Sequence, residues 1–141
     1  MLLIMIINSF LVGSAVLIHF EVLNWLSLTI PKLPVNRRLS VLFGIFGALI
    51  AHVIEVWLFA FGIYGLVHSK QFGELQGPIS NTLLDCVYFS FTCYTTLGFG
   101  DVRPIGLIRF LTGLEALTGV VLIAWTSSFM FIEMQKFWKA K

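Results

Sequence analysis

The chain has little charge: only 11% of its 141 residues are Asp, Glu, Lys or Arg, whereas 58% are hydrophobic. Soluble domains usually carry about 25% charged residues, so this composition excludes an ordinary soluble protein. Most of the basic residues lie in two short segments, 31–38 and 136–141, which leaves no extended basic face for nucleic acid. The composition therefore predicts an integral membrane protein.

Cysteine and catalytic groups are also scarce. The two cysteines, Cys86 and Cys93, lie seven positions apart in one predicted helix, too far apart for a disulfide, and we expect them to pack as apolar residues. We find no cluster of metal ligands and no nucleophile paired with a base. The sequence therefore predicts neither an enzyme nor a bound cofactor.

The N-terminal apolar run, residues 2–29, has no basic segment before it and is too long for a signal peptide. It is long enough to cross a bilayer, and Pro31 and Pro34 end it, because proline lacks a backbone N–H and restricts the preceding residue. The linker 31–38 is basic and contains no acidic residue. Since basic loops remain on the inner side of a membrane, this linker is expected to be cytoplasmic.

Two further apolar runs, residues 39–67 and 105–132, are predicted membrane spans. We expect the protein to lie in the cell membrane, with the polar segment 68–81 outside the cell and the basic C-terminal tail in the cytoplasm. Because the number of spans is then odd, Met1 is expected outside. The fold class predicted is an all-α membrane protein with three spans.

A fourth apolar segment, residues 82–94, is too short to span a bilayer. Ser80, Asn81 or Thr82 provides a side chain suited to capping its first turn, and Asp85 is favoured there by the helix dipole. This segment is expected to form a helix that enters the membrane and returns, with its negative C-terminal end facing the membrane interior.

The stretch Thr95-Thr96-Leu97-Gly98-Phe99-Gly100-Asp101 follows this short helix directly. Backbone carbonyls point to one side when successive residues alternate between right- and left-handed conformations, and glycine adopts the left-handed ones at the lowest cost. Gly98 and Gly100 have the required spacing. Leu97 and Phe99 would then turn outward into supporting packing, the Thr96 hydroxyl would add an inner oxygen, and Asp101 would lie at the outer mouth.

This stretch resembles the selectivity filter of potassium channels, Thr-Val-Gly-Tyr-Gly followed by Asp, with Leu97 and Phe99 in place of Val and Tyr. The resemblance implies K⁺ held by carbonyl oxygens of Thr96, Leu97, Gly98 and Phe99. It further implies a pore domain over residues 39–141 in a homotetramer surrounded by lipid, with residues 1–38 as an additional span and linker. Within that domain it assigns the outer helix to 39–67, the pore helix to 82–94, the filter to 95–101 and the inner helix to 105–132.

Two alternatives to a potassium-selective channel stay open. Leu97 and Phe99 depart from the usual filter residues and put its rigidity in doubt, which leaves a weakly selective cation channel of the same fold. The other alternative is a non-conducting membrane sensor or accessory subunit, and the sequence does not identify a regulatory partner.

Gly119 and Gly113 lie where inner helices of this family often bend, so each is a candidate hinge. A close contact between helices explains either glycine equally well, because small residues are common at membrane helix interfaces. By the same resemblance Val121, Ala124 and Ser128 would line a cavity below the filter.

The membrane spans contain a few ionisable residues, and such residues usually face protein or water. His52 and Glu55 are three residues apart on one helical face, so their side chains can interact. Glu115 lies at a depth in the membrane similar to that of Glu55, so the two carboxylates are predicted to meet behind the short helix. They form either a proton-sensitive brace or, as we favour, a static polar cluster. His19 is expected at the inner membrane interface. The pore-helix Glu that pairs with the Asp after the filter in some potassium channels is replaced by Thr92.

Overall fold

The computed structural model describes residues 2–139; Met1 and residues 140–141, which include Lys141 of the basic tail, lie outside the described part. Three helices within it are long and apolar enough to cross a membrane, over Leu2–Lys32, Arg38–His68 and Ile108–Lys136. The protein is therefore mostly helical and suited to a membrane, as its composition predicts.

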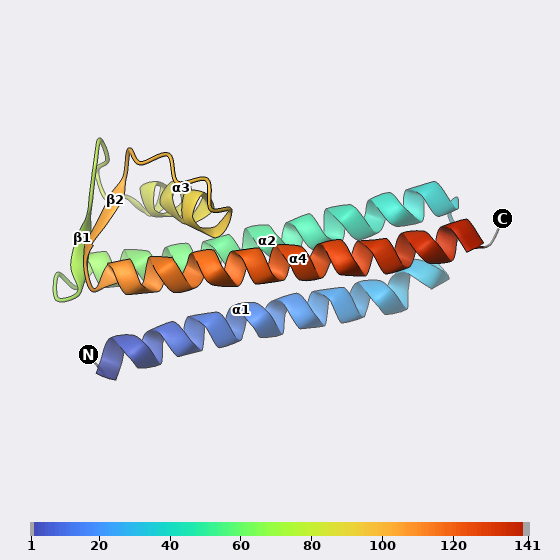
Figure 1. Cartoon of the computed structure of the whole chain (residues 1–141), viewed down its shortest axis with the longest axis horizontal. Coiled ribbons are helices and arrows are strands. Elements are labelled where there is room, and N and C mark those ends of the chain that lie inside the picture. Colours follow the sequence, from blue (N-terminus) through green and yellow to red (C-terminus); the bar gives the residue numbers. More distant parts are fainter. Residues whose placement is uncertain (1, 140–141) are drawn as a thin grey trace.

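The three long helices lie side by side along the length of the molecule (Figure 1). They are α1 (Leu2–Thr29), continued by a 3₁₀ turn η1 (Ile30–Lys32), α2 (Arg37–His68) and α4 (Ile108–Lys139). The short helix α3 (Leu83–Tyr94) packs against α2 and α4 at the end of the molecule where α1 begins. The α1–α2 connection and the C-terminal end of α4 lie at the opposite end.

A small β-ribbon corrects the expectation of a purely helical chain. Strands β1 (Gly73–Gln76) and β2 (Arg103–Gly106) pair antiparallel, and Gly73 lies opposite Gly106. Residues 105 and 106 thus belong to a strand and not to the inner helix, because Pro104 favours extended backbone and Gly106 adopts a left-handed φ of 82°. The ribbon joins the segment before α3 to the segment after residue 101.

Two helix boundaries also differ from the expected ones. The predicted outer helix, residues 39–67, begins earlier at Arg37, just after Asn36, and ends at His68. The predicted inner helix, residues 105–132, begins at Ile108 and continues to Lys139. Polar residues near its C-terminal end do not stop it, because Glu, Gln and Lys are good helix formers. The expected short helix 82–94 is correct, since Thr82 is the N-cap of α3.

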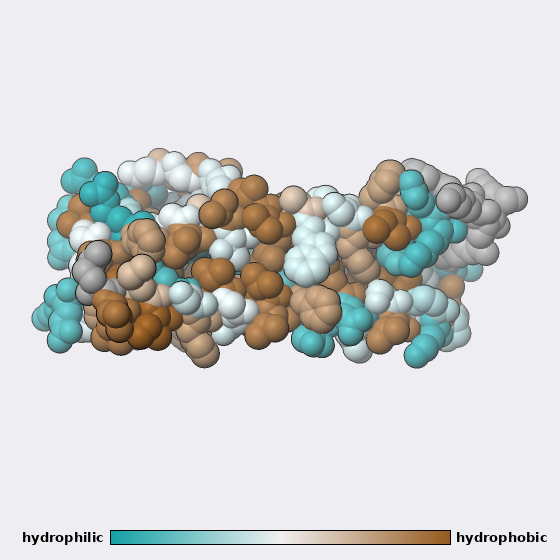
Figure 2. Space-filling model, turned by 60° about the horizontal axis from the view of Figure 1, so that its bottom comes forward, coloured by the Kyte–Doolittle hydropathy of each residue, from teal (hydrophilic) through white to brown (hydrophobic). Residues whose placement is uncertain are grey.

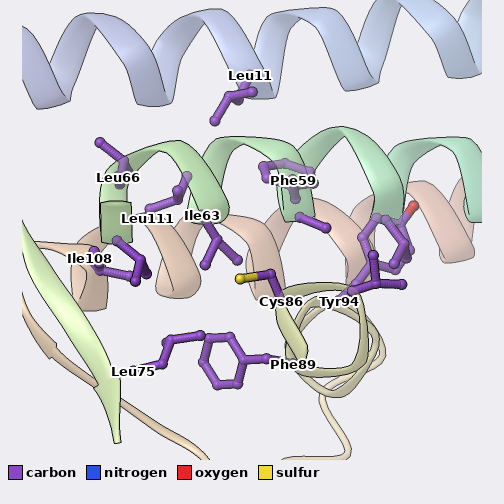
Figure 3. Packing of buried hydrophobic residues seen from close by; sticks show 14 of the residues in the cluster. Leu11, Phe59, Ile63, Leu66, Leu75, Cys86, Phe89, Tyr94, Ile108 and Leu111 are labelled. Carbon is purple, nitrogen blue, oxygen red and sulfur yellow. The ribbon is translucent and has the colours of Figure 1, made fainter. Parts of the chain in front are cut away.

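Small residues let α1 approach α2 closely, as is common between membrane helices. A Cβ at Gly62 would lie 2.5 Å from a methyl carbon of Leu11, and one at Gly47 would lie 2.6 Å from a methyl carbon of Leu26. Figure 3 shows Leu11 pointing at the α2 face that carries Phe59. The first span is therefore packed onto the rest of the chain.

The buried core joins the four helices and strand β1 at the α3 end of the molecule (Figure 3). Cys86 and Phe89 of α3 face Ile63 of α2 and Leu75 of the ribbon, and Ile108 and Leu111 of α4 complete the cluster. Both cysteines are free, as expected, and Cys86 is a packing residue. This core fixes α3 and hence the start of the segment that follows it.

Apolar side chains also cover much of the outer surface, as Figure 2 shows for one face, whereas hydrophilic residues gather at its two ends. Phe10, Leu17, Phe46 and Ile50 are each more than half exposed. Exposed apolar surface along a helical bundle that is polar at both ends fits a lipid environment.

Candidate functional site

Helix α3 begins with a capping box. The Asp85 backbone N–H donates to Thr82 Oγ1 over 3.2 Å, and the backbone N–H groups of Thr82 and Ser80 donate to Asp85 Oδ2. These bonds, those from Thr82 above all, lower the pKa of the Asp85 carboxyl. The cap is therefore fully present at neutral pH and weakens only as the pH falls through this lowered value.

The far end of α3 is held against both neighbouring helices. Ser90 Oγ donates to the backbone oxygen of Val56 in α2 over 2.8 Å. Gly119 of α4 touches the backbone of Tyr94, the last residue of α3, so closely that a Cβ at Gly119 would collide with the Tyr94 carbonyl oxygen. The segment after Tyr94 therefore starts from a fixed position.

The predicted filter segment, residues 95–101, has an alternating backbone. Thr96, Gly98 and Gly100 adopt left-handed φ values of 59°, 54° and 81°, whereas Leu97 and Phe99 are not among the residues with positive φ. The left-handed conformations at Gly98 and Gly100 were expected, and that at Thr96 was not. Such alternation turns successive carbonyl groups to one side of the chain.

Two backbone hydrogen bonds tie this segment to α3: Thr96 N–H donates to Cys93 O over 2.9 Å, and Gly98 N–H donates to Thr92 O over 3.2 Å. Beyond Gly98 the segment has little cover within its own chain. The side chains of Leu97 and Phe99 are 64% and 65% exposed, although both are large and apolar. The supporting packing expected around them is therefore not provided by a single chain.

Asp101 is held by a residue that sequence reasoning missed. The Tyr88 hydroxyl of α3 donates to Asp101 Oδ2 over 2.7 Å, and the Val102 N–H donates to Asp101 Oδ1. Thr92, at the position of the pore-helix Glu, donates instead to Phe89 O within its own helix. The sequence did contain a signal for this contact: Tyr88 lies one helical turn before Thr92 on the same face of α3, and it could have been predicted to bind Asp101 in place of the missing Glu.

The ionisable residues form two separate sites. Glu55 accepts hydrogen bonds from His19 and Tyr94 and lies 3.2 Å from His52 Nδ1, whereas Glu115 is hydrogen-bonded to Ser90. The prediction that the two carboxylates meet is therefore wrong, because each binds its own partners. Interaction of His52 with Glu55 is confirmed.

His19 is also misplaced by the sequence prediction. It is fully buried, and its Nδ1 lies 2.9 Å from Glu55 Oε1, so it belongs to the interior of the bundle and not to the inner membrane interface. Together His19, His52 and Glu55 make a group whose ligand atoms all lie within 4.8 Å of one another. The sequence showed no such cluster, because residues 36 positions apart converge only in the fold.

Glu115 of α4 is completely buried beside α3. One oxygen contacts Ser90 Oγ and the other has no hydrogen-bond partner. Ser90 has a single hydroxyl hydrogen, which the carbonyl of Val56 already attracts. Both contacts of Ser90 Oγ are satisfied when Glu115 carries the carboxyl proton and donates it to that oxygen.

The remaining predicted residues lie on α4. Gly113 has open space where a Cβ would be, in contrast to Gly119, and α4 continues as a helix through both. Val121, Ala124 and Ser128 are exposed in the single chain and share one helical face, with Ser128 Oγ bonded to the Ala124 carbonyl.

The fold and the site combine three helices long enough to cross a membrane with a short helix that leads into a segment of alternating backbone conformation. A family model described as ion channel matches residues 39–136. The chain belongs to this ion channel family.

Two other comparisons add little. A stretch of 72 residues is 32% identical to part of an uncharacterized protein of Methanothermus fervidus. The match covers 51% of this chain but only 9% of that protein. No solved structure matches the chain significantly.

Proposed function

We propose that the protein is a potassium-selective channel that lets K⁺ pass down its gradient, with no enzymatic activity. The observation that carries the proposal is the alternating backbone of Thr96, Gly98 and Gly100 directly after α3. A row of carbonyl oxygens replaces the water around a K⁺ ion without adding fixed charge. Thr96, Leu97, Gly98 and Phe99 would supply these oxygens, and the dipole of α3 would favour a cation near its C-terminal end.

The channel would be a homotetramer, because a closed ring of carbonyls needs several copies of one filter segment. The exposed Leu97 and Phe99 support this, since irregular backbone at membrane depth requires protein around it. A groove of about 660 Å³ between the filter segment and α4 offers space for a neighbouring copy. Its wall includes Thr96, Gly98 and Gly113.

The proposed orientation places α3 and the ribbon at the outer side of the cell membrane. Lys32 and Lys136 lie at the opposite end of the bundle, and basic residues are retained on the cytoplasmic side. The 31–38 linker and the C-terminal end would then be cytoplasmic, and the chain would begin outside.

Purified protein in liposomes tests the channel itself. The liposomes contain K⁺, and the outer solution contains a cation that does not cross the membrane. Passive K⁺ efflux builds up an opposing membrane potential unless protons flow in to balance the charge. We therefore expect K⁺ efflux when protons can enter, and we expect it to stop when proton entry is blocked. Chemical cross-linking in the same membranes should give a four-chain product. Liposomes without K⁺ efflux despite tetramers would favour the non-conducting accessory subunit.

Replacing Glu115 by Gln tests whether this buried group senses pH. A Gln amide donates to Ser90 Oγ as the protonated carboxyl does, so we expect wild-type stability and an unchanged response of the current to pH. The other ionisable side chains that interact with Glu115 are Cys93 and Tyr94 of α3. Glu115→Leu, which loses the hydrogen bond, should cost about 1 kcal/mol in unfolding free energy. A pH response that disappears in Glu115→Gln would instead make Glu115 a proton sensor.

A further inference from the structure

Four helices contribute polar side chains to one buried point beside the filter segment. His19 comes from α1, His52 and Glu55 from α2, Tyr94 from α3 and Thr126 from α4. His19 and Glu55 have fully buried side chains, and that of His52 is 15% exposed. Polar groups buried within a membrane are costly unless every one of them is paired, so their convergence calls for a specific reason.

Both histidines have the same orientation in this cluster. Their Nδ1 atoms point to the Glu55 carboxylate, at 2.9 Å for His19 and 3.2 Å for His52. Their Nε2 atoms point to the Thr126 hydroxyl oxygen, at 3.3 Å and 3.0 Å respectively. The two rings are neighbours, with centroids 5.1 Å apart.

When Glu55 is ionised and both imidazoles are neutral, the hydrogen atoms of the metal-free cluster do not suffice for this arrangement. If Glu55 is ionised, the two imidazoles, the Tyr94 phenol and the Thr126 hydroxyl each supply one hydrogen. They must serve the contacts of both Nδ1 atoms with Glu55, the Tyr94 contact with Glu55 and both Nε2 contacts with Thr126. One contact is left without a hydrogen and the charge of Glu55 is left unbalanced, so a cation, either a proton or a metal ion, completes the cluster.

We propose that this cation is a zinc ion bound by His19 Nδ1, His52 Nδ1 and the Glu55 carboxylate. Two imidazole nitrogens and one carboxylate are ligand types that Zn²⁺ prefers. Tetrahedral Zn²⁺ with ligands at about 2.0–2.1 Å separates the ligand atoms by about 3.3 Å. The spacings of 2.9 and 3.2 Å between the nitrogens and Glu55 are close to this value.

The fourth position falls to the Tyr94 phenol oxygen, which lies 2.9 Å from His52 Nδ1. Its hydrogen bond to Glu55 would be lost on binding, because two oxygens that share a hydrogen lie closer together than two ligands of one zinc ion. If the phenol gives up its proton on binding, its charge and that of Glu55 balance the two charges of Zn²⁺. A neutral site of this kind is less costly inside a membrane than a charged one.

Thr126 completes the site as a positioning residue. With zinc on Nδ1, both imidazoles carry their hydrogen on Nε2, and both donate it to the Thr126 oxygen, which has two lone pairs. Ligand histidines almost always donate their second N–H in this way, which sets the ring orientation. The missing hydrogen of the metal-free cluster is then no longer needed.

The zinc ion would join the first span to the helix that leads into the filter. Among these ligands His19 alone comes from α1, and Tyr94 is the residue before Thr95. The site thus gives the additional N-terminal helix a definite role, which is to brace the end of α3 from outside the pore.

The test is metal binding by the purified full-length chain in detergent. The protein is equilibrated with Zn²⁺, freed of excess metal, and its zinc content measured by elemental analysis. We expect one zinc per chain and, with Co²⁺ in its place, the intense visible absorption bands of tetrahedral coordination. His19→Gln and His52→Gln should lose both signals, and Thr126→Val should weaken binding by about 10–100-fold.

His68→Gln is the matched control, because His68 is exposed and bonds only the backbone oxygen of Tyr64 in its own helix. It should bind zinc as the wild type does. Circular dichroism and gel filtration of each variant show that lost binding does not reflect lost structure. Wild-type protein that binds no more zinc than His52→Gln overturns the proposal and assigns the extra charge to a proton. Because no ion flux is measured, this result stands apart from the test of channel function.

Discussion

Replacing Gly119 by Ala is expected to prevent formation of a folded filter. A Cβ there would collide with the carbonyl oxygen of Tyr94 and lie 2.9 Å from its carbonyl carbon, a distance that real Cβ atoms essentially never show. The obstacle is backbone and not a flexible side chain, and Tyr94 is fixed by the buried core. We expect destabilisation of about 3 kcal/mol, at the upper end for overpacking, together with loss of K⁺ flux. Thermal unfolding in detergent and liposome flux measure both.

Gly65→Ala is the matched control for this substitution. Gly65 also lies inside a long helix, but a Cβ there meets nothing within 4 Å. Alanine is the better helix former by about 1 kcal/mol, so stability should stay the same or rise. If Gly119→Ala is as stable as Gly65→Ala but opens differently, Gly119 is a hinge and not a contact residue.

Replacing Gly98 by Ala should abolish discrimination between K⁺ and Na⁺. Within its own chain no atom lies within 4 Å of a new Cβ, so the expected effect is conformational. Gly98 has a φ of 54°, and a left-handed conformation costs an L-residue about 1–2 kcal/mol. In a tetramer this cost arises four times at one level of the pore. The alternating backbone should therefore relax, and its carbonyl groups should turn away from the pore axis.

The measurement for Gly98→Ala is the ratio of K⁺ to Na⁺ permeability, with unfolding temperature as a check on the fold. We expect the ratio to fall toward one while the helices remain folded, because α3 and the core do not depend on Gly98. A variant that retains wild-type selectivity would show that the carbonyl at this position does not select the ion.

The sequence was most informative where one local rule decides the structure. Long apolar runs gave the three spanning helices, and the glycine spacing predicted left-handed backbone at Gly98 and Gly100. The sequence offered Ser80, Asn81 or Thr82 as the cap of α3, with Asp85 in the first turn, and the structure uses Thr82. A helix cap could be predicted because it depends on neighbours a few residues apart.

Contacts between residues far apart in the sequence could not be predicted by such local rules. The ribbon pairs Gly73 with Gly106, and four residues per strand carry too weak a signal to be seen in the sequence. Likewise His19 was assigned to the membrane interface because its partner Glu55 lies in another helix, and only the packing of α1 on α2 brings the two together. The left-handed φ of 59° at Thr96 was missed because a β-branched residue rarely adopts it.

The central claim is that the segment from Thr96 to Gly100 forms a filter that selects potassium. Its most direct test is the reversal potential of the purified wild-type channel in a planar bilayer, with K⁺ on one side and Na⁺ on the other. We predict a reversal close to the K⁺ equilibrium potential. A clear current that reverses near zero would contradict potassium selectivity and leave a weakly selective cation channel of the same family.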